Sequence, residues 1–127
     1  MAKLENKCRE VIEKGEWVAI ATAGADGPHL AGTWGEYIRA IGIGDGEIRI
    51  PVGGYITTEK NLLQNSRIEL LCGTRSVEGV HGPGKGCRIR GRGRVVTSGD
   101  QAAAAKKLFP WSRGVLVVTV DEAVSQL

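Results

Sequence analysis

The stretch Trp17-Val-Ala-Ile-Ala-Thr-Ala-Gly-Ala-Asp-Gly-Pro-His-Leu-Ala-Gly-Thr-Trp34 contains two β-rich runs on either side of a tight turn. The first run, residues 17–22, leads into Ala25-Asp-Gly-Pro28, a sequence typical of turns. The second run begins at His29, and we expect it to continue as a strand through Ile41. The stretch therefore predicts two β-strands joined by a turn.

The chain on either side of this stretch predicts four more strands and three helices. Strand patterns cover residues 47–52, 67–73, 87–97 and 115–120, and helix patterns cover 4–15, 58–65 and 100–109. A glycine-rich loop is expected over residues 79–86. The helices do not alternate regularly with strands, which argues against a parallel doubly wound sheet. We expect one mainly antiparallel barrel domain over residues 1–127, with an N-terminal helix and two short helices.

Composition and cysteine usage exclude several classes of protein. Of the 127 residues, 42% are hydrophobic and 24% are charged, which excludes wholesale disorder. The longest uncharged apolar run, residues 114–120, is too short to span a bilayer, and no signal-peptide pattern is present. Cys8, Cys72 and Cys87 form no CxxC pair. We expect three reduced thiols in a cytoplasmic protein without a membrane partner.

Motifs for hydrolysis or metal binding are weak in this chain. Gly79-Val-His-Gly-Pro-Gly-Lys85 resembles a P-loop, but Gly86 stands where Ser or Thr should hold magnesium, and a strand pattern follows instead of a helix. His29 and His81 have no second metal-type ligand at a useful spacing. We therefore expect no metal site and no catalytic side chain, so that any chemistry would come from a cofactor.

Four arginines, Arg88, Arg90, Arg92 and Arg94, alternate with apolar residues and glycines. In a strand, this spacing places all four guanidinium groups on one face. The face is either solvated and partly neutralised by acids such as Glu69, or it binds phosphate or a polyanion. No interleaved aromatic residue is available to stack bases, so nucleic acid is not the expected partner.

Two short stretches are candidates for ligand binding. Pro51-Val-Gly-Gly-Tyr-Ile-Thr-Thr58 ends a strand at paired glycines and then opens a helix with two hydroxyl groups. Close backbone approach, free N–H groups and hydroxyls suit a phosphate monoester, although one threonine could simply cap the helix. Ala31-Gly-Thr-Trp34 could accept the edge of a flat heterocycle, although a tryptophan in the core is the simpler alternative.

Several motifs occur in a fixed order along essentially the whole chain. They are Asp26-Gly-Pro-His-Leu30, Thr33-Trp34, Pro51-Val-Gly-Gly54, Gly82-Pro-Gly84 with Gly86, Ile89-Arg-Gly91, and Trp111 before Leu116-Val-Val-Thr-Val120. In this order they resemble the small FMN-binding proteins of anaerobic bacteria, in the flavin-binding split-barrel group related to pyridoxamine-phosphate oxidases. The resemblance implies a mainly β, six-stranded antiparallel Greek-key split barrel, one FMN per subunit, a homodimer and a redox role.

The resemblance also implies which residues bind the cofactor. The isoalloxazine is expected beside Ala31, Gly32, Thr33 and Trp34, and the phosphate around Gly53, Gly54, Thr57 and Thr58, with Pro51 and Val52 leading into that segment. Trp111 is expected to approach the flavin, and Leu127 to reach it from the other subunit. The member of this group that the chain resembles has Asn in place of Gly32 and Lys in place of Thr57. A cation from Arg90, or from Arg88, Arg92, Arg94 or Lys60, is expected to replace that lysine.

Electron transfer through the flavin is the function we expect, because no convincing proton donor is visible at the site. The redox partner is not identified by the sequence. A flavin-dependent oxidoreductase of the pyridoxamine-phosphate-oxidase or flavin-reductase type is the alternative. A nucleic-acid-binding β-barrel that uses Arg88 to Arg94 is a further alternative.

Overall fold

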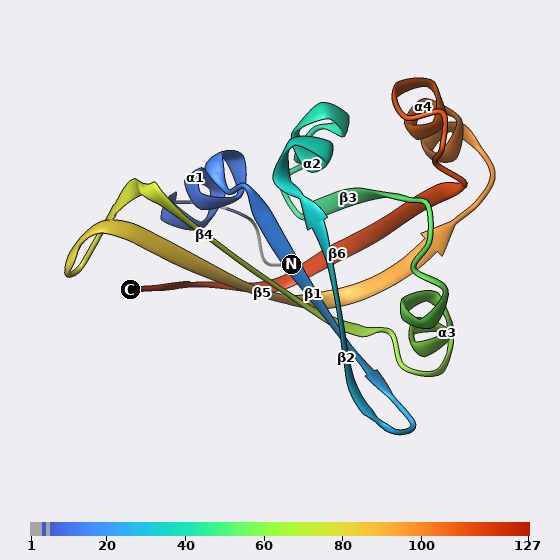
Figure 1. The fold of residues 1–127 in the computed structure, drawn as a ribbon, viewed down its shortest axis with the longest axis horizontal. Coiled ribbons are helices and arrows are strands. Elements are labelled where there is room, and N and C mark those ends of the chain that lie inside the picture. Colours follow the sequence, from blue (N-terminus) through green and yellow to red (C-terminus); the bar gives the residue numbers. More distant parts are fainter. Residues whose placement is uncertain (1–3, 5) are drawn as a thin grey trace.

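The computed structural model describes residues 4 and 6–127, and these form four helices and six strands. In chain order the elements are α1 (Asn6–Lys14), β1 (Trp17–Gly24), β2 (Gly27–Trp34), α2 (Gly35–Ile41), β3 (Glu47–Val52), α3 (Ile56–Gln64), β4 (Arg67–Gly79), β5 (Gly82–Val96), α4 (Asp100–Leu108) and β6 (Gly114–Gln126). Figure 1 shows the strands as a strongly curled sheet, with α1, α2 and α4 along its upper side and α3 at the lower right.

The six strands form one sheet in the order β2-β1-β4-β5-β6-β3, and every neighbouring pair is antiparallel. The two edge strands, β2 and β3, do not pair with each other, so the curled sheet stays open along one side. The prediction of a mainly β, antiparallel split barrel is confirmed.

The inner face of the curled sheet holds the hydrophobic core. Along β1, Val18 and Ile20 are fully buried while their neighbours are not, which is the period-2 pattern of a strand with one covered face. At one end of the sheet, α1 adds Val11 and Ile12, both fully buried. Burying such a side chain contributes about 1.5–3 kcal/mol, so α1 is an integral part of the core.

The expected strand from His29 to Ile41 is wrong in its second half, because the chain turns into α2 at Gly35. Gly35 packs directly on the backbone carbonyl of Gly15, and its N–H donates to the carbonyl of Glu16 at 2.8 Å. A Cβ at this position would overlap the Gly15 carbonyl oxygen. This close contact ends β2, and the chain continues as a helix with Ile38 buried.

The glycine-rich loop expected over residues 79–86 is also wrong, since β5 already begins at Gly82. β4 and β5 pair as far as Gly79 and Gly82, so only two residues form the turn. Gly82 and Gly84 adopt φ angles of 125° and 128°, which only glycine adopts easily. Glycine therefore allows an irregular strand here. β6 likewise extends beyond the expected residues 115–120.

The expectation of three reduced thiols is corrected by a disulfide between Cys8 of α1 and Cys87 of β5. The cytoplasmic location was expected from those thiols, so it loses that support. Cys72 is the free cysteine; it is buried and lies opposite Cys87 in the β4–β5 register. Burial raises the pKa of its thiol to about 12. In the part of the chain that the structure describes, no helix is long and apolar enough to cross a membrane.

Candidate functional site

A hollow of about 300 Å³ opens where β1, β2, α2, β3, the loop before α3 and the turn before β6 come together. Its lining is rich in aromatic residues and glycines: Trp17, Gly32, Thr33, Trp34, Tyr37, Pro51, Gly53, Gly54, Tyr55 and Trp111. The two ligand-binding stretches predicted from the sequence, which are far apart in the chain, thus share one hollow with Trp111. We call it the aromatic hollow.

One wall of the aromatic hollow is built from Trp17, Gly32 and Trp34. The β1–β2 register places Trp17 opposite Trp34, and their rings meet edge to face with centroids 4.8 Å apart. A Cβ on Gly32 would overlap the indole of Trp17, so the indole occupies the space that a side chain at position 32 would need. Both tryptophans are nearly half exposed, which leaves apolar ring surface open at this wall.

Tyr55 fixes the entry into α3. It is the N-cap residue of α3, with a left-handed backbone (φ 57°, ψ 35°), and its hydroxyl donates to the carbonyl of Gly32 at 2.6 Å. Burial raises the pKa of the Tyr55 phenol, and nearby Tyr37 adds to the shift while Thr33 opposes it. The phenol therefore stays protonated at neutral pH and holds β2 against the start of α3.

Two further lining residues of the aromatic hollow, Tyr37 and Trp111, belong to a cluster of three rings with Phe109. Tyr37 lies 4.9 Å from Phe109 and 5.5 Å from Trp111, measured between ring centroids. Trp111 also packs beside Gly53, where a Cβ would come within 3.0 Å of the indole. Glycine at position 53 thus lets the indole lie against the loop backbone.

The start of α3 has the features of an anion site. Thr58 is fully buried in its first turn, and its hydroxyl has no hydrogen-bond partner among the described residues. The N-cap residue is Tyr55, and its side chain makes no capping bond; Thr58 lies inside the helix, so it is not the N-cap. Free N–H groups at a helix start favour anions. Together with the backbone at Gly53 and Gly54, they fit a flat ligand that carries a phosphate.

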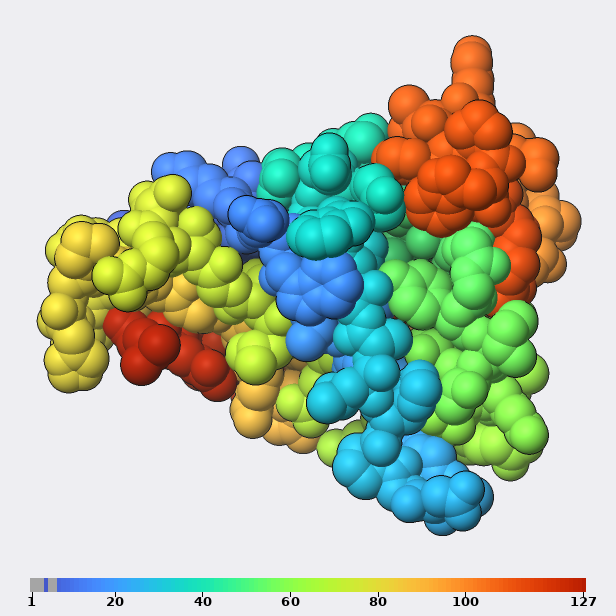
Figure 2. Space-filling model, viewed as in Figure 1, coloured from blue at the N-terminus to red at the C-terminus, as the bar shows by residue number. Residues whose placement is uncertain are grey.

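Arg113 supplies a cation beside the same loop. Its Nε donates to the carbonyl of Gly53 at 3.0 Å and its Nη2 to that of Gly54 at 2.7 Å. Nη2 also lies 2.8 Å from a carboxylate oxygen of Glu59. Figure 2 shows the orange-red turn that leads into β6 lying directly against the green segment that opens α3.

Several predicted site residues lie outside the aromatic hollow. Ala31 packs against the core, and Val52 is fully buried in it. Thr57 is exposed in the first turn of α3. Leu127, 73% exposed, accepts a backbone hydrogen bond from Val80 at the tip of the β4–β5 hairpin. The C-terminus lies at the left of Figure 1, beside that hairpin.

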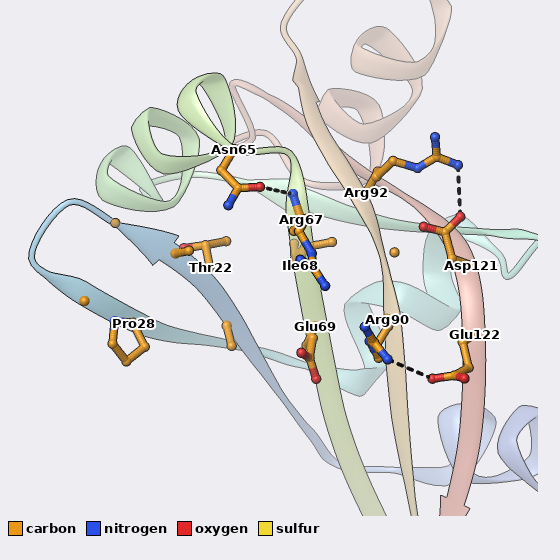
Figure 3. Close-up of a pocket in the computed structure, with 15 residues that line it drawn as sticks. Thr22, Pro28, Asn65, Arg67, Ile68, Glu69, Arg90, Arg92, Asp121 and Glu122 are labelled. Carbon is orange, nitrogen blue, oxygen red and sulfur yellow. Dashed lines mark hydrogen bonds and ion pairs between the residues drawn. The ribbon is translucent and has the colours of Figure 1, made fainter.

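Arg90 lines a different and larger hollow of about 760 Å³, on the outer side of β4, β5 and β6. In Figure 3, Arg90 points toward Glu122 and Arg92 toward Asp121. The N–O distances are 3.4 Å and 2.9 Å, and Arg88 lies 3.8 Å from Glu69. Three of the four alternating arginines are therefore paired with acids.

A β-bulge explains how two consecutive acids both face this row of arginines. The β5–β6 register shifts between Arg90 and Gly91, so that Arg90 pairs with Glu122 but Gly91 with Val120. Asp121 is the extra residue. In a regular strand Asp121 and Glu122 would point to opposite faces. The sequence did not reveal this bulge.

Trp17, Tyr37, Tyr55 and Arg113 line or support the aromatic hollow but were missed from the sequence. Trp17 was recoverable, because a hairpin closed at Gly24 and Gly27 brings Trp17 opposite Trp34. The sequence pattern predicts a strand at Tyr37, whereas the structure has α2 there. Nothing in the sequence pattern pointed to Arg113, which reaches residues about sixty positions away in the chain.

Comparison with known proteins shows the family and the fold of the chain. Residues 4–125 match the sequence profile of the pyridoxamine 5'-phosphate oxidase family. An FMN-binding protein of Nitratidesulfovibrio vulgaris (strain DSM 19637 / Miyazaki F) is 42% identical over 119 residues, which cover 93% of this chain and 94% of that protein.

Solved structures share the fold at lower identity. HupZ from Group A Streptococcus has a TM-score of 0.74 and 20% identity, covering 92% of this chain and 91% of that one. An FMN-binding protein from Syntrophomonas wolfei has a TM-score of 0.65 and 16% identity, covering 94% and 83%. With the profile match over nearly its whole length, the chain belongs to the pyridoxamine 5'-phosphate oxidase family.

Proposed function

We propose that this protein binds FMN in the aromatic hollow and works as an electron-transfer flavoprotein. The observation that carries the proposal is the junction of this hollow with the Gly53–Gly54 loop and the start of α3. A space lined by aromatic rings and a candidate anion site thus lie next to each other, as a flavin with a phosphate-bearing side chain requires. The 42% identical relative is named an FMN-binding protein, which supports the same ligand.

The residues of the chain divide into two roles. Trp17, Trp34 and Trp111 supply ring surfaces that exclude water and orient a flat ring system. Thr58 and the N–H groups at the start of α3 supply neutral donors to a phosphate. When bound, FMN supplies the redox chemistry, and the protein contributes binding, orientation and the local electric field.

Electron transfer is favoured over substrate oxidation because of what lines the aromatic hollow. Among the described lining residues there is no carboxylate, histidine, lysine or cysteine. The ionisable groups there are the phenols of Tyr37 and Tyr55, and the Tyr55 hydroxyl already donates to a backbone carbonyl. A reaction that needs proton transfer from a side chain of this lining would therefore depend on the Tyr37 phenol, a weak acid at neutral pH.

We further propose that the protein acts as a homodimer through the outer sheet face. We define this face by two cross-strand rows: Gly32–Ala19–Leu71–Arg88–Val124 and Leu30–Ala21–Glu69–Arg90–Glu122. No helix of the described chain covers these half-exposed apolar residues, and the arginines and glutamates alternate across the strands. A second copy can match such a surface, because a two-fold interface brings the same patch against itself. Trp17 and Trp34 continue the face into the aromatic hollow, and a partner seated on it could bring its own Leu127 toward the flavin.

The test of the proposed function is flavin uptake by the purified protein. Added to the protein freed of flavin, FMN should bind at about one molecule per chain and show the shifted visible spectrum of a flavin in an apolar site. Denaturation should release FMN and not FAD. A protein that takes up neither FMN nor riboflavin would contradict the proposal.

A flavin-dependent oxidoreductase is a second candidate, favoured by the profile match to pyridoxamine 5'-phosphate oxidase. The distinguishing assay follows oxidation of pyridoxamine 5'-phosphate, and of reduced nicotinamide cofactors, by the flavin-loaded protein. Multiple turnovers with one of them would favour the oxidoreductase. Reduction only by a protein or artificial electron donor would favour electron transfer.

The nucleic-acid-binding alternative has less support. The guanidinium groups of Arg88, Arg90 and Arg92 each lie within 4.0 Å of a carboxylate, so a phosphate backbone would have to compete with these acids. Binding to oligonucleotides that falls steeply with added salt would be the result in its favour.

A further inference from the structure

Arg113 holds the Gly53–Gly54 loop from the far end of the chain. Its backbone N–H donates to the carbonyl of Val52 at 2.7 Å. Its side chain donates to the next two carbonyls, with 3.0 Å from Nε to Gly53 and 2.7 Å from Nη2 to Gly54. Three successive carbonyls of the loop thus accept hydrogen bonds from one residue, and this fixes the guanidinium group relative to the loop.

The guanidinium group of Arg113 also forms an ion pair with Glu59 and keeps one nitrogen without a partner among the described residues. Nη2 lies 2.8 Å from Oε1 of Glu59, which belongs to the first turn of α3, and the two side chains are only 33% and 29% exposed. Nη1 has no partner among the described residues, so its two N–H groups are available to an incoming acceptor. Glu59 balances the charge of Arg113 and competes with any anion for it.

We propose that Arg113 is the cation that binds the phosphate of FMN in this protein, and that Glu59 limits how tightly it does so. The proposal rests on the proposed function. Phosphate prefers guanidinium to ammonium where the group can be presented in a fixed orientation, and the two loop carbonyls provide that orientation. The unpartnered hydroxyl of buried Thr58 lies in the same first turn of α3 as Glu59 and gives a second donor for the same anion.

This assignment differs from the expectation that an arginine of β5, or Lys60, supplies the charge. Arg88, Arg90 and Arg92 lie on the outer sheet face and are paired with Glu69, Glu122 and Asp121. Thr57 carries no charge, although it lies in the first turn of α3. Among the residues that the structure describes, Arg113 is the cation with hydrogen bonds to the Gly53–Gly54 loop.

A competing explanation is that Arg113 only braces the loop. The two roles predict different effects on two ligands, because riboflavin has the same ring system as FMN but no phosphate. A brace affects the binding of both flavins equally. A residue that binds the phosphate affects FMN alone. It therefore changes the dissociation constant of riboflavin divided by that of FMN, a ratio that we call the FMN preference.

The experiment measures the dissociation constants of FMN and riboflavin for wild type, Arg113→Lys and Arg113→Gln, at low and high salt. Loss of a hydrogen-bonded charge should lower the FMN preference of Arg113→Gln about ten- to hundredfold. Arg113→Lys should keep part of the preference, because the charge remains while the fork is lost. Salt should weaken FMN binding less in Arg113→Gln than in wild type. Thr58→Ala provides the reference for loss of a neutral phosphate donor.

Glu59→Gln tests the proposal without removing the brace. With the competing carboxylate gone, FMN should bind several-fold more tightly, and riboflavin should bind as before. Glu78→Gln, a change on the β4–β5 hairpin outside both hollows, is the matched control and should leave both constants unchanged. This arm holds even if Arg113→Gln fails to fold.

Four results separate the possible failures. Unchanged dissociation constants of both flavins in Arg113→Gln would overturn the role of Arg113 while leaving FMN binding intact. No gain in FMN affinity in Glu59→Gln would overturn the role of Glu59. An equal loss of both flavins in Arg113→Gln would make Arg113 a brace only. Failure of wild type to bind either flavin would instead overturn the proposed function itself.

Discussion

At the scale of single residues, the tryptophans of the aromatic hollow should govern the photophysics of a bound flavin. Trp34 and Trp111 line it, and Trp17 lies 4.8 Å from Trp34, centroid to centroid. A nearby indole quenches an excited flavin by donating an electron. Replacing each of the three separately by Phe should lengthen the fluorescence lifetime of bound FMN in at least one variant. If the fluorescence lifetime is unchanged in all three variants, these tryptophans contribute packing and do not quench the flavin.

The effects of substitutions at Gly32 and Trp17 on the free energy of unfolding should not be additive. A Cβ on Gly32 would overlap the Trp17 indole, so Gly32→Ala should lower the free energy of unfolding by about 1–3 kcal/mol. In a Trp17→Val background the overlap is gone, and the same change should cost much less. Urea denaturation of the four proteins gives the coupling energy. Additive effects would mean that the indole moves aside freely.

At the scale of elements, the β-bulge between β5 and β6 depends on Gly91. A Cβ there would overlap the backbone carbonyl oxygen of Thr119, which cannot swing away as a side chain could. We expect Gly91→Ala to lower the free energy of unfolding by about 1–3 kcal/mol, measured by urea denaturation.

The matched control for Gly91→Ala is Gly73→Ala on β4. The nearest atom to its Cβ would be the carbonyl oxygen of Lys85 at an ordinary 3.6 Å. That change should stay within about 0.5 kcal/mol of wild type. Equal effects of the two changes would show that loss of glycine flexibility, and not the bulge, decides stability.

The link between α1 and β5 should be visible by counting thiols. In the native protein the Cys8–Cys87 bond and the buried Cys72 thiol should leave little to react with a thiol reagent. Unfolding without reductant should expose the thiol of Cys72 alone, and unfolding after reduction should expose all three cysteines. Three thiols in the unreduced, unfolded protein would contradict the disulfide.

How far the sequence predicts these elements depends on which interactions create them. Alternation along β1 and β3 is local, so their strands were predicted close to where they lie. The helix α2 depends on the contact between Gly35 and Gly15. The disulfide depends on α1 meeting β5, and the bulge on strand register. Contacts between distant segments leave no periodic pattern in either segment.

In the candidate site, too, some residues could be predicted from the sequence and others depend on contacts between distant segments. The segments around Trp34, Gly53 and Trp111 were predicted to share a site, and the structure brings them together in the aromatic hollow. The family resemblance contributed that grouping, because nothing in their spacing indicates it. The alternation of Arg88, Arg90, Arg92 and Arg94 predicts a phosphate cation at Arg90, but in the structure Arg90 pairs with Glu122 on the outer sheet face. Arg113, which belongs to no motif in the sequence, is a cation that contacts the loop.

At the scale of the whole molecule, the outer sheet face should hold two copies together. Leu71 lies in the middle of that face, 48% exposed, so Leu71→Glu should place a charge in an apolar contact and yield monomers. Analytical ultracentrifugation measures the change. Leu63→Glu, which alters an 81% exposed leucine on α3, is the matched control and should leave the dimer intact. A wild type that is monomeric at high concentration would contradict the dimer.

The disulfide between α1 and β5 also changes how electrons must be counted in this protein. A disulfide accepts an electron pair when it opens to two thiols, as a flavin does when fully reduced. Cys8 and Cys87 are 4% and 0% exposed, so a small reductant reaches this bond slowly. A reductive titration of the flavin-loaded protein should therefore show a fast phase, in which the flavin is reduced, and a slow phase, in which the buried disulfide is reduced. Electron equivalents that are counted after a long incubation will therefore exceed the two electrons of the flavin by up to the two electrons that the disulfide accepts.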